Sequence, residues 1–215
     1  MKKILVLGAL LLVLAACSTA PAPTKVLYFA DYAIGTDYAA AGLASSAYAV
    51  TVATDWTDFN TKLAAGPSAY KLAVIMNQNS GIGANLATLT TYLGAGGRAV
   101  LADWTEDSSF GTLFNATYTG NDNNPSPTIS FTSMPALGIG LSSSTLTLTN
   151  PGWGVYSMGL APASGGLSVC TFNSGDSCVV LGNAGRTALV GFLSDTLPAA
   201  DGAKFYANLY RLVLK

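Results

Sequence analysis

The chain has 215 residues, of which 50% are hydrophobic and 10% are charged. Lysine and arginine number 10 against 11 acidic residues, so we expect no specific nucleic-acid binding. Histidine is absent, which excludes Ser-His-Asp and Cys-His triads and histidine-based zinc sites. The length suits one domain, and the composition is sufficient for a sizeable core.

The N-terminus combines a basic start, an apolar run and a cysteine. Lys2 and Lys3 precede the run from Ile4 to Leu14, and two small residues then precede Cys17. The run is shorter than the roughly 20 residues that span a bilayer, although a membrane-spanning helix and an ordinary secretory signal are the alternatives. The segment resembles a bacterial lipoprotein signal, which implies cleavage before Cys17 and attachment of lipid to it.

This resemblance divides the chain into a signal peptide (1–16), a lipidated cysteine with a flexible tether (17–24) and a folded domain (25–215). Several acyl chains hold a protein on a membrane firmly, so we expect a lipid-anchored protein of the cell envelope. Ser18 follows the cysteine, which favours the outer membrane in a host that has one, with the domain facing the periplasm or the exterior. Without its signal the chain keeps 8 basic and 11 acidic residues, a net charge of -3, so attraction to anionic head groups is not expected to anchor it.

The apolar pattern of the first half predicts strands and helices in alternation. Runs at 25–30, 49–54, 70–76 and 98–102 are typical of buried strands. A helix from Thr36-Asp37 to about Ala47 follows the first run, and a second helix capped by Asp55 to Asp58 follows the second. The third precedes the helical spacing of Leu86, Leu89 and Leu93. Strands separated by single helices form a parallel sheet with right-handed crossovers and helices on both faces.

The second half has shorter apolar runs separated by Gly, Pro, Asn and Ser. They predict antiparallel strands added at the edge of the sheet, with one or two late strands rejoining its centre. Asp201 begins a last helix with Phe205 and Leu209 on one face. The predicted strands lie at 128–131, 145–149, 155–160, 167–172, 178–181 and 188–193.

Cys170 and Cys178 are the other two cysteines, and such a pair is expected to oxidise in an exported chain. A three-residue loop at Asn173-Ser174-Gly175, with Gly175 in the left-handed position, places residue 170 opposite residue 178. Facing residues on paired strands lie about 4.5 to 5.5 Å apart, which suits a disulfide. A reactive dithiol is the alternative, but no Cys-x-x-Cys motif or neighbouring base activates either thiol. We predict a structural disulfide.

Several segments together resemble the class I glutamine amidotransferase-like fold: Lys25–Asp31, Gly96–Trp104, Asn150–Gly154, Leu181–Asn183 and Gly191–Leu193. The resemblance implies a flavodoxin-like, three-layer α/β sandwich with a mainly parallel central sheet. In that superfamily a nucleophilic cysteine lies on a strand-to-helix turn, and a histidine and an acid follow a late strand. The matching segments here, 103–105 and 191–195, contain neither cysteine nor histidine, which contradicts glutaminase or cysteine-peptidase chemistry.

The carboxyl ends of the predicted strands carry acids, and ligands of open α/β sheets bind at that edge. Converging carboxylates hold divalent cations or form acid/base pairs, whereas the alternative is that each aspartate caps a helix. Tryptophans beside polar groups suit a sugar, although core packing is their commoner role. The edge is expected to carry Asp31, Asp55, Asn77, Asp103 and Asp195, and the candidate ligand-binding residues are Asp31, Asp103, Trp104, Asp195, Asn183 and Trp153.

Two functions fit these features. The first is a membrane-anchored lipoprotein with a non-catalytic amidotransferase-like domain that binds a carbohydrate or an envelope protein. The second is a carboxylate-based or metal-dependent hydrolase of envelope glycans, with Asp103 and Asp31 or Asp195 as acid, base or ligands. A close cluster of those three acids favours the hydrolase, and acids bonded to their own helix N-termini favour the binding module. A purely structural lipoprotein is a third alternative. Gly81–Gly83 and Gly94–Gly97 lack the lysine of a P-loop, and we expect no cofactor.

Overall fold

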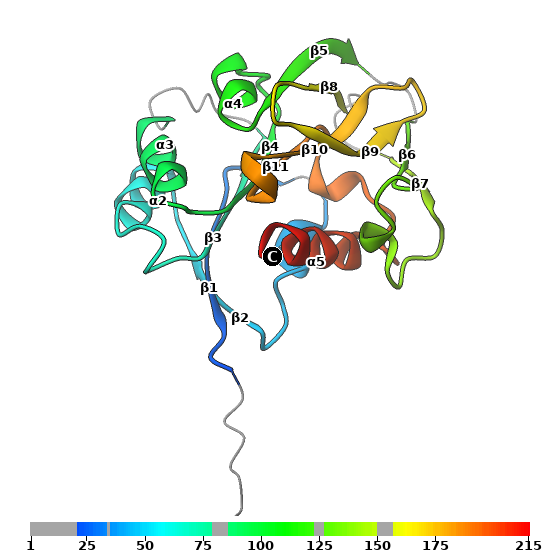
Figure 1. Cartoon of the computed structure of the whole chain (residues 1–215). Coiled ribbons are helices and arrows are strands. Elements are labelled where there is room, and N and C mark those ends of the chain that lie inside the picture. The colour runs from blue at the N-terminus through cyan, green and yellow to red at the C-terminus, as the bar shows by residue number, and fades with distance from the viewer. Residues whose placement is uncertain (1–20, 34, 79–85, 123–126, 150–156) are drawn as a thin grey trace, which may run out of the picture.

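A single sheet of eleven strands organises the part of the chain that is described, which is residues 21–33, 35–78, 86–122, 127–149 and 157–215 of a computed structural model (Figure 1). The strand order is β2-β1-β3-β4-β11-β10-β9-β6-β7, with β5 and β8 paired beside it. The first five strands in this order are parallel, and the rest are joined in antiparallel pairs. The predicted α/β fold class and the return of a late strand to the centre are therefore confirmed.

The parallel half alternates strands and helices as the apolar pattern predicted. Its elements are β1 (Thr24–Ala30), α1 (Tyr38–Ala41), β2 (Tyr48–Val52), α2 (Trp56–Leu63), β3 (Leu72–Asn77), α3 (Leu86–Gly94) and β4 (Ala99–Asp103).

The second half is richer in strands and ends in the longest described helix. Its elements are α4 (Ser108–Leu113), β5 (Ala116–Asp122), β6 (Thr128–Ser130), η2 (Pro135–Gly138), β7 (Thr145–Thr147), β8 (Met158–Pro162), β9 (Leu167–Phe172), β10 (Ser177–Gly182), η3 (Asn183–Gly185), β11 (Thr187–Val190), η4 (Ser194–Thr196) and α5 (Gly202–Val213).

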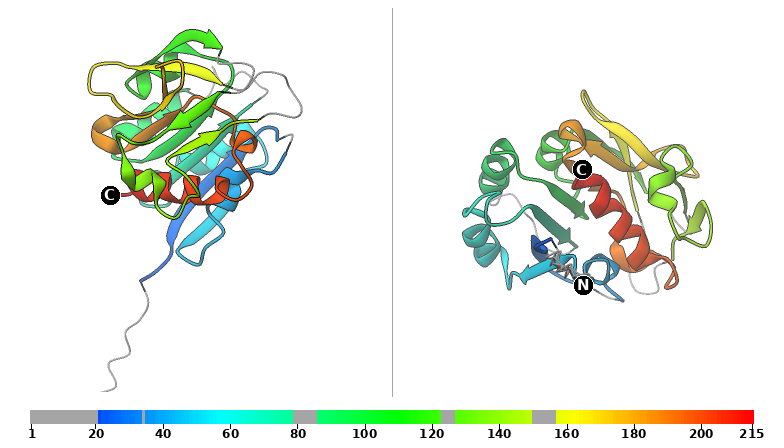
Figure 2. Two further views of the ribbon diagram at one scale, coloured as in Figure 1. Left: turned by 90° about the vertical axis from the view of Figure 1, so that its right-hand side faces the viewer. Right: turned by 60° about the horizontal axis from the view of Figure 1, so that its bottom comes forward.

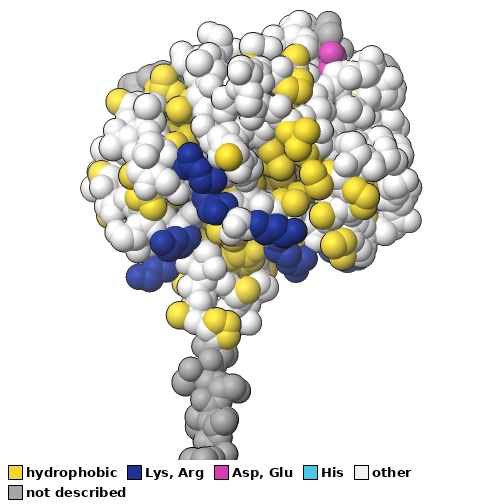
Figure 3. Space-filling model, viewed as in Figure 1, with side chains coloured by type: hydrophobic (Ala, Val, Ile, Leu, Met, Phe, Trp, Pro, Cys, Tyr) yellow, Lys and Arg dark blue, Asp and Glu magenta, His cyan; other side chains and the backbone are white. Residues whose placement is uncertain are grey.

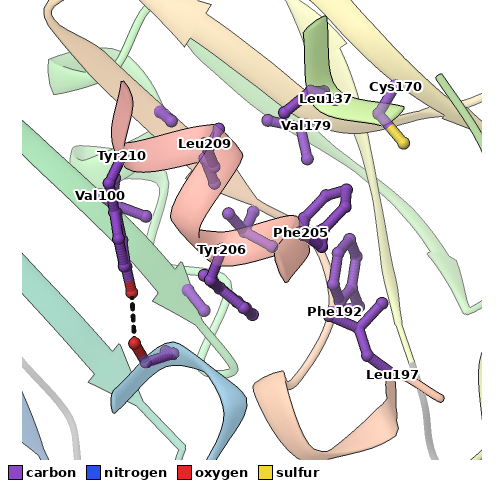
Figure 4. Close-up of a cluster of buried hydrophobic side chains, with 14 of the residues drawn as sticks. Val100, Leu137, Cys170, Val179, Phe192, Leu197, Phe205, Tyr206, Leu209 and Tyr210 are labelled. Carbon is purple, nitrogen blue, oxygen red and sulfur yellow. Dashed lines mark hydrogen bonds between the residues drawn. The ribbon is translucent and has the colours of Figure 1, made fainter. Parts of the chain in front are cut away.

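Helices cover both faces of the parallel strands and make three layers (Figure 2). Side chains alternate along β1, so Val26 and Tyr28 pack with α1 and α5, whereas Leu27 and Phe29 pack with α2 and α3. Figure 4 shows the α5 side of this core, where Tyr210 donates a 2.8 Å hydrogen bond to the carbonyl of Ala39. The layered core holds the strand ends in fixed positions relative to one another.

Two local predictions are wrong. The helix expected to run to Ala47 is a single turn that ends at Gly42, a poor helix former. Gly42 lies against α5, where an added Cβ would stand 2.8 Å from Cβ of Tyr206. Helix α4 and strand β5 were not predicted, since Ser108–Leu113 is short and contains Gly111 and two serines, which are weak helix formers. No helix in the described ranges is long and apolar enough to cross a membrane.

The β9–β10 hairpin has the predicted turn but a different register. Gly175 has φ +100°, as the left-handed position requires. Thr171 faces Ser177 as predicted, but a bulge at Cys178 then places Val179 opposite Cys170, so the prediction of a directly facing cysteine pair is wrong. Both cysteines are buried and present as free thiols. Burial raises the pKa of the Cys178 thiol, and the neighbouring Cys170 raises it further.

Candidate functional site

The candidate site lies at the carboxyl edge of the parallel strands. Asp31 follows β1, Asn77 ends β3, and Asp103 ends β4, where the strand register pairs it with Asn77. Oδ1 of Asp31 accepts a 2.6 Å hydrogen bond from the backbone N–H of Gln78. The end of β3 therefore connects two of the acids that the sequence predicted for this edge.

Asp103 is fully buried and is the most extensively hydrogen-bonded carboxylate of the site. Its Oδ1 accepts from Nδ2 of Asn77 at 2.6 Å and from both the N–H and the hydroxyl of Thr105, at 3.1 and 2.7 Å. Its Oδ2 accepts from the N–H of Asp107 at 2.9 Å and from the Tyr118 hydroxyl at 3.1 Å. Five donors thus meet a group that offers about four lone-pair positions.

Tyr118 remains a hydrogen-bond donor over the whole physiological pH range. Burial raises the pKa of its hydroxyl well above the ordinary value, and the adjacent charge of Asp103 raises it further. The hydroxyl comes from β5, which the sequence did not predict, so its role at the site was missed as well.

Two buried amide oxygens at the end of β3 have no hydrogen-bond partner among the described residues: Oδ1 of Asn77 and Oε1 of Gln78. Asn77 is fully buried and Gln78 is 2% exposed. Because Nδ2 of Asn77 donates to a carboxylate, the orientation of this amide is fixed and its oxygen must point elsewhere. A buried acceptor left unsatisfied costs about 1–3 kcal/mol, so these oxygens need an explanation.

The turn from β4 to α4 completes this side of the edge. Glu106 has φ 53°, a left-handed conformation that is costly for a non-glycine residue and typical of functional turns. Asp107 then caps α4 through a 2.8 Å bond from the N–H of Ser109. Trp104 is half-buried, and its backbone N–H donates to the carbonyl of Asn77 at 2.8 Å. The five donors on Asp103 hold this turn against β3.

Asp195 belongs to a second polar group, beside the loop after β1. Its Oδ2 accepts from the N–H of Gly35 at 3.1 Å, while its Oδ1 is buried without a partner in the described parts of the chain. Asp37 lies near it and accepts from the hydroxyls of Tyr28 and Ser194 and from the N–H of the first turn of α1. No group of three or more Cys, Asp or Glu side chains in the described parts of the chain is arranged to hold a metal ion.

Asn183 does not lie at this edge, which corrects the prediction. Strand β10 runs antiparallel to β11, so the residue that follows it lies at the amino edge of the parallel strands. There Nδ2 of Asn183 donates to the carbonyl of Leu113 and to the hydroxyl of Thr187, at 2.9 and 3.1 Å. Asp55, by contrast, caps α2 through the N–H of Asp58, as the capping alternative predicted. Trp153 and Cys17 lie outside the described residues.

The arrangement of strands and helices matches solved structures, whereas no family model and no curated protein matches the sequence. A ThuA-like protein from Bacteroides uniformis is similar with a TM-score of 0.60 at 11% identity, covering 92% of this chain and 94% of that one. A GMP synthase subunit from Thermoplasma acidophilum gives 0.55 at 8% identity, covering 87% and 95%. An α-L-fucosidase from Paenibacillus thiaminolyticus gives 0.54 at 11% identity, covering 88% of this chain and 33% of that enzyme. These likenesses establish an amidotransferase-like, flavodoxin-like fold.

Proposed function

We propose that this chain is a lipid-anchored envelope protein whose amidotransferase-like domain binds a ligand at the carboxyl edge without transforming it. The observation that carries the binding role is that two buried amide oxygens, on the consecutive residues Asn77 and Gln78 at the end of β3, have no partner among the described residues. A ligand that donates hydrogen bonds to them would remove the cost of burying them unsatisfied.

The hydrogen bonds of Asp103 argue against the hydrolase alternative. A general acid or base must exchange a proton with the substrate, which requires an oxygen whose lone pairs are not already engaged. The two oxygens of Asp103 already accept five hydrogen bonds from its own chain. This carboxylate is better suited to fixing the turn after β4 than to proton transfer.

The chemistry of the edge suits a neutral, hydroxyl-rich ligand such as a sugar. Amide oxygens accept from hydroxyl donors, and the half-buried Trp104 follows on the neighbouring strand end and offers an apolar ring for stacking. The fold also forms part of the fucosidase chain, an enzyme that acts on a carbohydrate. An envelope protein is the alternative ligand.

A thermal-shift screen of residues 18–215 against neutral mono- and disaccharides tests this proposal. A ligand at 100 times its Kd stabilises the folded state by about 2.7 kcal/mol, which raises Tm by about 5–10 °C in a domain of this size. Gln78→Met keeps the length of the side chain but removes the acceptor, so it should abolish the shift. Asn208→Leu, on α5, is the control, because it should lower Tm and leave the ligand-induced shift unchanged. If no sugar shifts Tm, or if Gln78→Met retains the shift, the site is wrong.

The membrane anchor is proposed from the lipoprotein-like signal alone. Mass spectrometry of the N-terminal peptide should find a diacylglycerol and an acyl chain on Cys17, and fractionation should place the protein in the outer membrane of a two-membrane host. Cys17→Ser should leave the precursor unprocessed. A mature N-terminus at another residue would contradict the anchor.

A disulfide between Cys170 and Cys178 is the remaining part of the proposal. Because burial raises the pKa of the Cys178 thiol, the folded pair exchanges slowly and the bond should form before the hairpin is buried. Exported protein should therefore show no free thiol at these two positions when it is unfolded in urea. Two titratable thiols under those conditions would contradict the disulfide.

A further inference from the structure

Basic residues lie at the amino ends of four parallel strands and form a row at the amino edge of the sheet. Lys25 lies at the start of β1, Lys71 precedes β3, Arg98 precedes β4, and Arg186 precedes β11. Backbone hydrogen bonds join these positions in sequence: the N–H of Lys71 to the carbonyl of Lys25 at 2.9 Å, that of Ala73 to Arg98 at 2.8 Å, and that of Ala99 to Arg186 at 3.1 Å. We name these four residues the basic row; at a strand spacing of about 4.8 Å it extends over about 14 Å.

Helix α5 adds positive charge beside the row. Arg211 is in its last turn and Lys215 follows its end, and both are exposed. Figure 3 shows the Lys and Arg side chains gathered on this side of the molecule, close to the start of β1. Lys204, in the first turn of α5, lies at the other end of that helix.

Eight of the eleven acidic residues lie at the opposite edge. These eight follow the carboxyl ends of parallel strands or stand at helix N-termini, as Asp55 and Asp107 do. The single ion pair among the described residues joins Lys62 to Asp58 within α2, so no acid neutralises the basic row by direct pairing. The acids at this edge are Asp31, Asp37, Asp55, Asp103, Glu106, Asp107, Asp195 and Asp201.

Helix capping accounts for only half of the basic row. Arg98 donates to the carbonyl of Val213 at the end of α5. Arg186 donates to the carbonyls of Leu93, in the last turn of α3, and of Gly97, beyond that helix, at 3.0 and 3.1 Å. Lys25 and Lys71 are exposed, and neither belongs to the ion pair of the described residues. A structural role therefore leaves the two lysines unexplained, whereas Arg211 donates one hydrogen bond, from Nη1 to Oδ1 of Asn208 at 2.9 Å.

We propose that the basic row, with Arg211, is the surface through which the domain rests on anionic lipid head groups. The chain itself indicates this partner, since the proposed lipid at Cys17 is separated from β1 by the tether 18–23, and the row begins at Lys25. The seven Cα–Cα steps from Cys17 to Thr24 span at most about 25 Å, which keeps this face near the bilayer at millimolar effective concentration. The orientation, which rests on the proposed anchor, points the carboxyl-edge site away from the membrane.

A net charge of -3 suggests that the protein is repelled by anionic head groups, but the basic row makes one face of the domain an exception. Because the charges are separated to two ends of the domain, the face next to the membrane is positive although the molecule is negative. Each basic residue near an anionic surface contributes about a fivefold increase in binding, and the attraction extends over a Debye length of about 8 Å at physiological salt. The lipid provides the anchoring, and the basic row sets the orientation.

Co-sedimentation of residues 18–215 with vesicles tests the surface without the lipid anchor. All described helices and strands begin at or after Thr24, so this chain lacks no element of the fold. Binding to phosphatidylglycerol vesicles in 50 mM salt should exceed binding to phosphatidylcholine vesicles and should weaken in 500 mM salt. Lys71→Gln should lower the partition constant about fivefold, and Lys25→Gln with Lys71→Gln about thirtyfold. Lys204→Gln, an exposed lysine at the opposite edge, should change nothing.

Three results would overturn the proposal: equal binding to both kinds of vesicle, an equal loss for Lys204→Gln, or equally tight binding to duplex DNA. The last would assign the row to polyanions in general. Failure of the anchor is measured separately, because mass spectrometry of Cys17 does not depend on the basic row.

Discussion

The role assigned to Asp103 predicts a large difference between two Asp→Asn substitutions at the same edge of the sheet. Asp103→Asn replaces one buried carboxylate oxygen by an NH₂ group. Whichever oxygen is lost, at least two donors lose their acceptor, because Oδ2 serves Asp107 and Tyr118 while Oδ1 serves Asn77 and Thr105. Asp55→Asn makes the same chemical change at an exposed helix cap.

The magnitude follows from the number of donors. A hydrogen bond to a charged group is worth about 1.5–3 kcal/mol, so the loss of two amounts to about 3–6 kcal/mol. The Tyr118 hydroxyl rotates and can accept instead of donate, which favours the lower part of that range. For a domain of 150–250 residues, a loss of about 3–6 kcal/mol lowers Tm by about 6–24 °C. Asn is as good an N-cap as Asp, so Asp55→Asn should shift Tm by less than about 2 °C.

Differential scanning calorimetry of residues 18–215 at pH 7 measures both variants, and near-UV circular dichroism checks that each is folded before heating. If Asp103→Asn costs less than about 1 kcal/mol, or no more than Asp55→Asn, the carboxylate is not held as described. Asp103 would then be available for chemistry, and the hydrolase alternative would regain its main candidate.

Three further outcomes follow from the packing. Gln78→Met should raise Tm of the unliganded domain by about 2–10 °C in calorimetry, because it removes a buried acceptor that has no partner among the described residues. A lower Tm would show that the Gln78 oxygen is hydrogen-bonded in the folded domain. Burial raises the pKa of Tyr92 to about 12, so its contribution to stability is complete below its ordinary value near pH 10 and is lost between pH 10 and 12. Urea unfolding across that range should therefore show a slope shallower by up to about 1.4 kcal/mol per pH unit for Tyr92→Phe, and parallel slopes would refute the shift. Gly182→Ala should destabilise the domain strongly in the same assay, because the added Cβ would lie 2.1 Å from the carbonyl oxygen of Phe114. Gly94→Ala is the control: nothing lies within 4 Å of its added Cβ, so this substitution should be neutral or stabilising.

The parallel half of the fold could be predicted from the sequence because its signals are local. Residues 72–77 are all buried, which gives a continuous apolar run, and Asp55 begins α2 with an N-cap that the sequence displays directly. The bulge at Cys178 could not be predicted, because it depends on which residue β9 presents to it. Asn183 was misplaced for the same reason, since strand direction decides the edge at which a loop lies.

The candidate site was predicted in part. Asp31 and Asp103 could be placed at one edge because parallel strands end together, but Asp195 joined a different group through Gly35. The oxygen of Gln78 carried no sequence signal at all, because an unsatisfied acceptor is a property of the packed surroundings. The sequence pattern therefore predicts which edge of the sheet carries the polar residues. The packing of the folded domain determines which of those polar groups are left without a hydrogen-bond partner and can bind a ligand.

The basic row, by contrast, has a signal that the sequence does display. A basic residue lies at or before the start of four parallel strands, and an acid ends or directly follows two of them, as in Lys25 with Asp31 and Arg98 with Asp103. In an antiparallel sheet, basic residues at strand starts and acids at strand ends would alternate between the two edges, and their charges would cancel. In a parallel sheet every strand points the same way, so all the basic starts lie at one edge and all the acidic ends at the other. The positions of charged residues relative to strand direction therefore predict a dipolar domain, which the net charge of -3 alone does not indicate.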